Sequence, residues 1–118
     1  MALRRIKTYS GGQGYVYEYY FVGKREAIGS PVRAIEYIFD VTSDKKTTYS
    51  VSIFLQEEAL KSWDRAHGRS LFDAEQYGAV KMRLFQAFDE IENLLQDGRR
   101  LSIDSVQLEQ LLLNLGVT

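Results

Sequence analysis

The sequence contains no cysteine, one proline and one histidine. Without cysteine, the chain can form no disulfide, no thiolate zinc site and no cysteine nucleophile. The single histidine, His67, leaves too few strong ligands for a structural metal site. We therefore expect a protein that folds without a metal ion or any other cofactor.

Neither sign of charge dominates, and no long hydrophobic run is present. Fifteen basic residues face sixteen acidic ones, which disfavours a dedicated nucleic-acid binder because such proteins rely on an excess of Lys and Arg. The longest apolar run, at residues 111–113, is far below the roughly 20 residues that span a bilayer. No apolar segment of a secretory signal follows the basic start. These absences predict a cytoplasmic protein with no membrane partner.

Two periodicities divide the chain. Up to about residue 56, apolar and polar side chains alternate, which is typical of strands, and from about residue 57 apolar side chains recur at helical spacing. We predict an α+β fold: an antiparallel β-meander of three to four strands followed by two to three helices packed mainly on one sheet face. A length of 118 residues suits one core, so we expect a single domain over 1–118, with strands at about 3–56 and helices at about 57–115.

The strand half predicts strands at 15–22, 32–42 and 47–56, and leaves open whether 3–9 forms another. The clearest alternation places Tyr49, Val51, Ile53 and Leu55 on one face. The glycine-rich segment 11–14 indicates a hairpin turn, because a phosphate-binding loop would need a helix after it and a strand follows instead.

The helical half predicts a short helix at 57–67 that ends at Gly68, a long helix at 73–96 and a last one at 104–115. Asp73 with Gln76, and Asp104 with Gln107, have the spacing of capping boxes. Such boxes mark helix N-termini, where the side chains bond to unpaired backbone N–H groups.

The second face of the predicted sheet is the main candidate for an interaction surface. Apolar patches rimmed by polar residues often mark such surfaces. The residues that gather there are Val16, Tyr20, Val22, Ile38 and Phe54, among Glu18, Glu36 and Asp40. A second candidate is the leucine-rich last helix, with Leu108 and Leu112. The alternatives are that another part of the chain covers the face and that the leucines belong to the core.

His67 is the main candidate for catalysis. With Asp64 on the same helix it could form a general base, but the sequence does not place a serine nucleophile beside it. The alternative is a surface histidine at a helix C-terminus, where positive charge is favoured. We therefore predict no catalytic, cofactor-binding or metal-binding residue.

The leading hypothesis is a small non-enzymatic protein that forms a homodimer or larger homo-oligomer, or that binds a protein partner. A single-stranded nucleic-acid-binding module is the alternative, with Tyr20 and Phe54 as stacking platforms and nearby acidic residues opposing the phosphates. A small enzyme that uses His67 comes third. The order of strands followed by helix resembles the architecture of single-strand DNA-binding transcription coactivator domains, and this likeness implies nothing about function.

Overall fold

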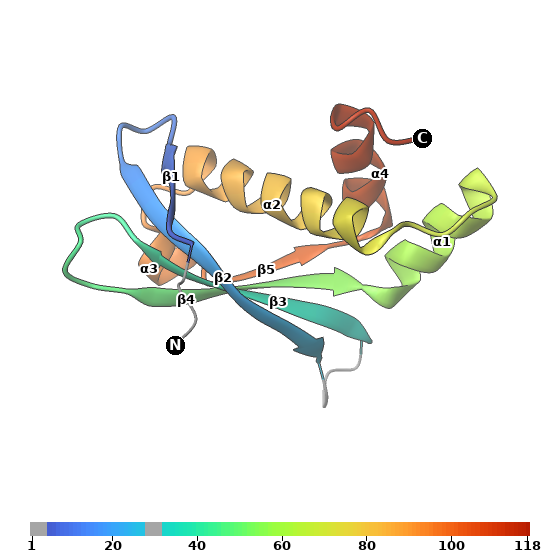
Figure 1. The fold of residues 1–118 in the computed structure, drawn as a ribbon, viewed down its shortest axis with the longest axis horizontal. Coiled ribbons are helices and arrows are strands. Elements are labelled where there is room, and N and C mark those ends of the chain that lie inside the picture. Colours follow the sequence, from blue (N-terminus) through green and yellow to red (C-terminus); the bar gives the residue numbers. More distant parts are fainter. Residues whose placement is uncertain (1–4, 28–31) are drawn as a thin grey trace.

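The computed structural model describes residues 5–27 and 32–118, and the chain opens with four strands in a meander (Figure 1). Each strand pairs antiparallel with the next. The strands are β1 (Lys7–Ser10), β2 (Val16–Glu26), β3 (Ala34–Thr42) and β4 (Tyr49–Gln56). The predicted α+β class with a mainly antiparallel sheet is confirmed. Of the segment 3–9, residues 7–9 belong to β1, and residues 3 and 4 lie outside the described residues.

Alternation along the strands gives the sheet one buried face. Aromatic and β-branched side chains dominate this face, as suits a pleated surface that packs against other elements. Its buried residues are Tyr17, Tyr19, Tyr37, Phe39, Val41, Tyr49, Val51, Ile53 and Leu55. The residues between them in sequence point to the opposite face.

Helices make up most of the second half of the chain, and a fifth strand lies among them. The elements are α1 (Glu57–His67), α2 (Asp73–Glu90), α3 (Leu94–Asp97), β5 (Arg100–Ile103) and α4 (Ser105–Asn114). β5 pairs parallel with β4, so the sheet has the order β1-β2-β3-β4-β5 and the prediction of three to four strands was wrong. Four residues are too short a segment for alternation to be recognised. A parallel neighbour also needs a long crossover connection, which α1, α2 and α3 supply.

The long helix ends earlier than predicted. α2 stops at Glu90, because Ile91 has an extended backbone with φ −96° and ψ 110°. The apolar side chains of Ile91 and Leu95 continue the helical spacing in sequence, so the break is invisible there. After the break, α3 directs Leu94 into the core, where its side chain is buried.

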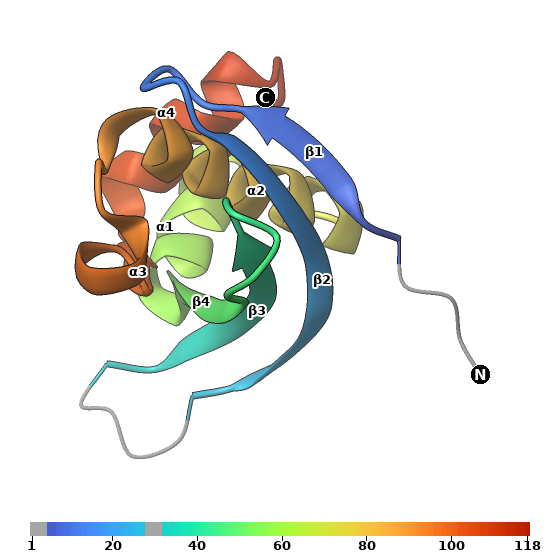
Figure 2. The same cartoon turned by 90° about the vertical axis from the view of Figure 1, so that its left-hand side faces the viewer.

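The helices lie inside the curve of the sheet (Figure 2). One core joins them to the buried sheet face, with Trp63 from α1, Phe88 from α2 and Leu112 from α4. The ring of Phe88 stacks on that of Tyr17, with centroids 4.2 Å apart and planes 9° from parallel. No helix among the described residues is both long enough and apolar enough to cross a membrane.

The predicted helix ends are partly correct. Asp104 and Gln107 form a reciprocal capping box at α4, and Gly68 ends α1 in the left-handed conformation with φ 70°, both as predicted. The box predicted for Asp73 is wrong, because the N-cap of α2 is Phe72 and the residue that bonds back to it is Glu75.

Candidate functional site

The outer face of the sheet carries no described helix, and it is the candidate site. We call it the open face. Its described members include Val16, Glu18, Tyr20, Arg25, Ala34, Glu36, Ile38, Asp40, Ser50, Ser52, Phe54, Gln56, Arg100 and Ser102. The face therefore mixes apolar, aromatic and charged side chains across four strands.

Glu36 is the most buried charged group of this face. Its Oε1 accepts a hydrogen bond from Arg25 Nε at 2.8 Å, and its Oε2 accepts one from Ser52 Oγ at 2.6 Å. These two bonds hold the pKa of Glu36 below its ordinary value. The carboxylate is therefore ionised even though only 7% of the residue is exposed, and each of its two oxygens accepts a hydrogen bond.

Asp40 forms a second pair of bonds on the other side of Ile38 along β3. Its Oδ2 accepts a hydrogen bond from the Tyr20 hydroxyl at 2.6 Å, and its Oδ1 accepts one from Ser50 Oγ at 3.2 Å. Each carboxylate thus bonds to side chains on both neighbouring strands. The arrangement fixes these side chains and meets much of their hydrogen-bonding capacity within the face.

A β-bulge in β2 brings Arg25 to the open face. The register shifts between Phe21 and Gly23, where Val22 is the additional residue. One extra residue reverses the face to which later side chains point. Simple alternation along β2 would direct Arg25 to the core, whereas the bulge places it opposite Glu36.

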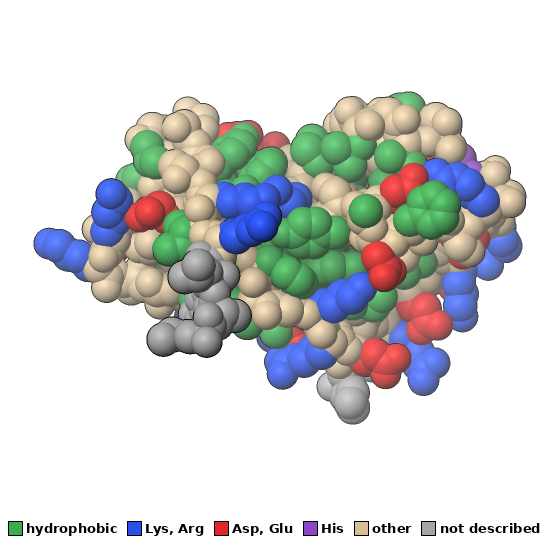
Figure 3. All heavy atoms as spheres, in the orientation of Figure 1, with side chains coloured by type: hydrophobic (Ala, Val, Ile, Leu, Met, Phe, Trp, Pro, Cys, Tyr) green, Lys and Arg blue, Asp and Glu red, His purple; other side chains and the backbone are tan. Residues whose placement is uncertain are grey.

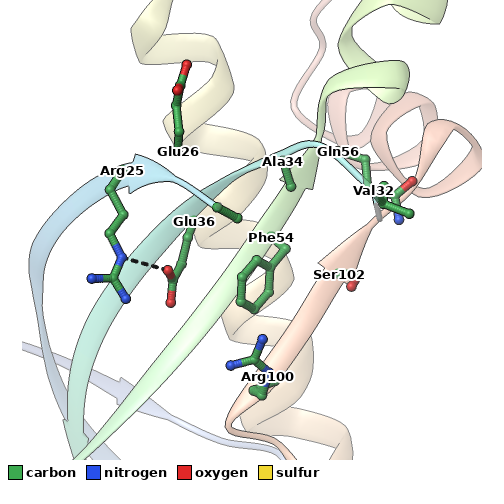
Figure 4. Close-up of a pocket in the computed structure, with 10 residues that line it drawn as sticks. Arg25, Glu26, Val32, Ala34, Glu36, Phe54, Gln56, Arg100 and Ser102 are labelled. Carbon is green, nitrogen blue, oxygen red and sulfur yellow. Dashed lines mark hydrogen bonds and ion pairs between the residues drawn. The ribbon is translucent and has the colours of Figure 1, made fainter. Parts of the chain in front are cut away.

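A shallow cavity of about 780 Å³ lies at this end of the open face (Figure 4). Phe54 lies between Glu36 and Arg100, and the Arg100 guanidinium is 4.7 Å from the centre of the Phe54 ring. The Nη groups of Arg25 and the whole guanidinium of Arg100 form no hydrogen bond to a described residue. The cavity therefore presents an aromatic ring beside two cations, one of which is partly neutralised by Glu36.

The structure brings together most of the predicted interaction residues. Tyr20, Ile38 and Phe54 are half-buried on the open face, and Val16 and Val22 are each 52% exposed, the latter at the bulge. The two leucines of the last helix are placed differently: Leu108 and Leu112 are fully buried in the core. They hold α4 against the sheet, so α4 does not present them to a partner.

His67 is not paired with Asp64. Its Nε2 bonds to both carboxylate oxygens of Glu109, at 2.8 and 3.0 Å, and its ring stacks on Trp63. Asp64 instead accepts a hydrogen bond from Ser70 Oγ at 3.1 Å. His67 therefore joins α1 to α4. Within residues 5–27 and 32–118, no group of three or more His, Asp or Glu side chains is arranged to hold a metal ion.

Two arginines of the site were missed in the sequence. Arg25 was not assigned to the open face because the strand was predicted to end at residue 22, whereas β2 continues through a bulge to Glu26. Gly23 lies just past that predicted end, although glycine within a strand is also a usual signal for a bulge. Arg100 was missed because β5 was not recognised. Arg100 and Ser102 do alternate with Leu101 and Ile103, but this signal spans only four residues, too few to identify a strand.

Another apolar patch lies on the side where β2 passes α2. Phe21 is 39% exposed, and its ring lies 5.1 Å from that of Tyr77 in an edge-on contact. Figure 3 shows hydrophobic side chains gathered near the middle of this view, with basic side chains beside them. This patch belongs to the edge of the core and is separate from the open face.

Comparison with protein-family models gives no match, and comparisons with curated proteins and with solved structures give no significant one. The geometry of the site is therefore the basis for any functional assignment.

Proposed function

We propose that this chain is a small cytoplasmic, non-enzymatic protein whose helices cover one face of the sheet and whose open face docks against a second copy of the chain. The observation that carries the proposal is that two carboxylates of an uncovered sheet face, those of Glu36 and Asp40, are bonded within the face. Burial away from water costs less free energy for a polar group that is already hydrogen-bonded than for one that is not. The open face is therefore suited to burial against another protein surface.

The apolar side chains of the face favour the same function. Ile38 lies near the centre of the sheet, with Phe54 on the next strand and Val16 toward one end. In a single protomer these side chains remain partly in water, and a partner surface would remove them from it.

The size and charge of the face suit a symmetric pair. Five strands that hold 36 residues in all, about 4.8 Å apart and with about 3.3 Å per residue, give a face of roughly 600 Å². A typical interface buries about 800 Å² per partner. Glu18 lies toward one end of the strands and Arg25 toward the other, so a two-fold axis across the strands brings opposite charges together.

The experiment is a measurement of mass by light scattering across the micromolar range. We expect a dimer for the wild type. Phe54→Glu introduces a charge within the contact, so it should shift the protein to a monomer without changing the far-UV circular dichroism. The matched control is Val106→Glu, the same kind of change at a side chain of α4 that is 79% exposed, and it should remain dimeric. A monomeric wild type throughout the range would refute the proposal.

Single-stranded nucleic acid is the second candidate ligand of this face. The stacked pair of Arg100 and Phe54 favours it, because base stacking and a nearby cation are what such sites use. The carboxylates of Glu18, Glu36 and Asp40 oppose it. Salt-dependent binding of an oligonucleotide that Phe54→Ala abolishes would favour this candidate over the dimer.

A further inference from the structure

A second cavity, of about 560 Å³, lies at the other end of the strands from Phe54. It is bordered by the start of β2, the β3–β4 hairpin and the segment around α3, which lie together at the left of Figure 1. Its lining includes Tyr15, Tyr17, Asp44, Tyr49, Glu92 and Asp97. The cavity is on the helical side of the sheet, so it is separate from the open face.

Two tyrosine hydroxyls in this cavity have no hydrogen-bond partner among the described residues. Tyr17 and Tyr49 are only 2% and 9% exposed, both line the cavity, and neither hydroxyl forms a hydrogen bond with a described residue. By contrast, the hydroxyls of Tyr9 and Tyr20 donate to Asp89 and Asp40. Unlike the hydroxyl of Tyr37, these two are not sealed from solvent, so they open into the cavity and are free to hydrogen-bond a ligand there.

The side chains around the cavity set the charge of that ligand. Asp44, Glu92 and Asp97 line it, and no Lys or Arg is among the described lining residues. Arg99 is nearby, but its Nε donates to the carbonyl oxygen of Ser50 at 3.1 Å. Burial, with Tyr17 and Asp44 close by, raises the pKa of Tyr49 to about 12. Near neutral pH the cavity therefore offers neutral phenols among carboxylates, and a cation is the complementary ligand.

We infer that this cavity binds a small organic cation, a guanidinium or primary ammonium group on a short apolar stem. The N–H groups of the cation would donate to the Tyr17 and Tyr49 oxygens and to the carboxylates. Leu94 and Leu95, which also line the cavity, and the ring of Tyr15 would contact the stem. Such a group belongs either to a free amine or to an Arg or Lys side chain of a peptide.

The first experiment is calorimetric titration of the full chain with n-butylguanidinium, and with n-butylurea as the neutral analogue of the same shape. We expect saturable binding of the cation only. A second arm uses a short capped peptide that contains one arginine. Tighter binding of the peptide would identify a protein side chain as the source, and tighter binding of the free cation would identify a small amine. Absence of saturable binding of either cation, or equal binding of the urea, would overturn the inference.

The second experiment tests the residues. The double variant Tyr17→Phe with Tyr49→Phe keeps both rings and removes both hydroxyls, and it should weaken binding about tenfold or more. Asp97→Asn should also weaken it. Tyr20→Phe, which removes a hydroxyl on the open face, is the control and should bind like the wild type. Thermal melting verifies that each variant folds, and unchanged affinity in a folded double variant would refute the assignment.

Discussion

The tyrosine hydroxyl contributes differently to stability at Tyr9 and at Tyr37. The hydroxyl of Tyr9 donates to Asp89 Oδ2 at 2.9 Å, which ties β1 to α2. The hydroxyl of Tyr37 is buried and has no hydrogen-bond partner among the described residues. A buried polar group without a partner has lost its bonds to water and gained none in exchange.

Tyr37→Phe should therefore leave the free energy of unfolding unchanged or raise it by up to about 1 kcal/mol. Tyr9→Phe is the matched control, and it should lower the free energy of unfolding by about 0.5–1.5 kcal/mol because it removes a bond that is made. Urea unfolding of the two variants measures both values. A larger loss in Tyr37→Phe than in Tyr9→Phe would show that the Tyr37 hydroxyl has a partner.

Among the elements, α2 begins with a charged cap. Glu75 Oε1 accepts a bond from the Phe72 backbone N–H, and both its oxygens accept bonds from Arg69, all at 2.9 Å. The bond from Arg69, followed by that from Phe72, lowers the pKa of Glu75 to about 2. A carboxyl whose pKa is lowered by folding stabilises the protein above its unfolded pKa, and this contribution is lost as the pH falls.

Glu75→Gln should lower the melting temperature at neutral pH, and its difference from the wild type should shrink as the pH falls from 4.5 toward about 2. Protonation of Glu75 in the wild type then has the same effect as the substitution. Thermal unfolding followed against pH tests this. Glu90→Gln, at an exposed residue with no hydrogen bond or ion pair to a described residue, should match the wild type throughout. A difference for Glu75→Gln that stays constant across this range would contradict the explanation.

Elements with strong periodicity could be predicted from sequence, and those defined by distant contacts could not. The alternation in β4 and the box of Asp104 with Gln107 are local signals, and both are correct. β5 forms only because β4 offers it an edge, and α2 ends where the chain turns to bury Leu94. At the site, alternation identified the face of Ile38 and Phe54. It missed Arg25, because β2 continues beyond the predicted end at residue 22, through a bulge whose extra residue reverses the phase of the strand.

At the scale of the whole molecule, burial makes the protein sensitive to alkali. It raises the pKa of most tyrosines above the ordinary value of 10.0. These residues are Tyr9, Tyr17, Tyr19, Tyr37, Tyr49 and Tyr77. A group whose pKa is raised by folding gives its full stabilisation below its unfolded pKa, and this contribution is lost as the pH rises through the folded value.

We expect stability to fall steeply between pH 10 and about 12, the pKa of Tyr49. Tyrosinate absorbance and far-UV circular dichroism, followed together during alkaline titration, measure ionisation and unfolding. The two should change in one step, because most of these phenols ionise only when the core opens. Ionisation of most tyrosines near pH 10 with the circular dichroism intact would contradict this expectation.

The parallel strand β5 also makes some contacts of the sheet slower to form than others. The hairpins of the meander join residues that are close along the chain, whereas Ser52 meets Arg100 only after α1, α2 and α3 have been traversed. The entropy lost on closing a loop grows with its length. Contacts between β4 and β5 therefore contribute most to the contact order of the sheet, which is the quantity that slows the folding of small domains. One four-residue strand at the edge of the sheet thus raises the kinetic barrier for the whole chain.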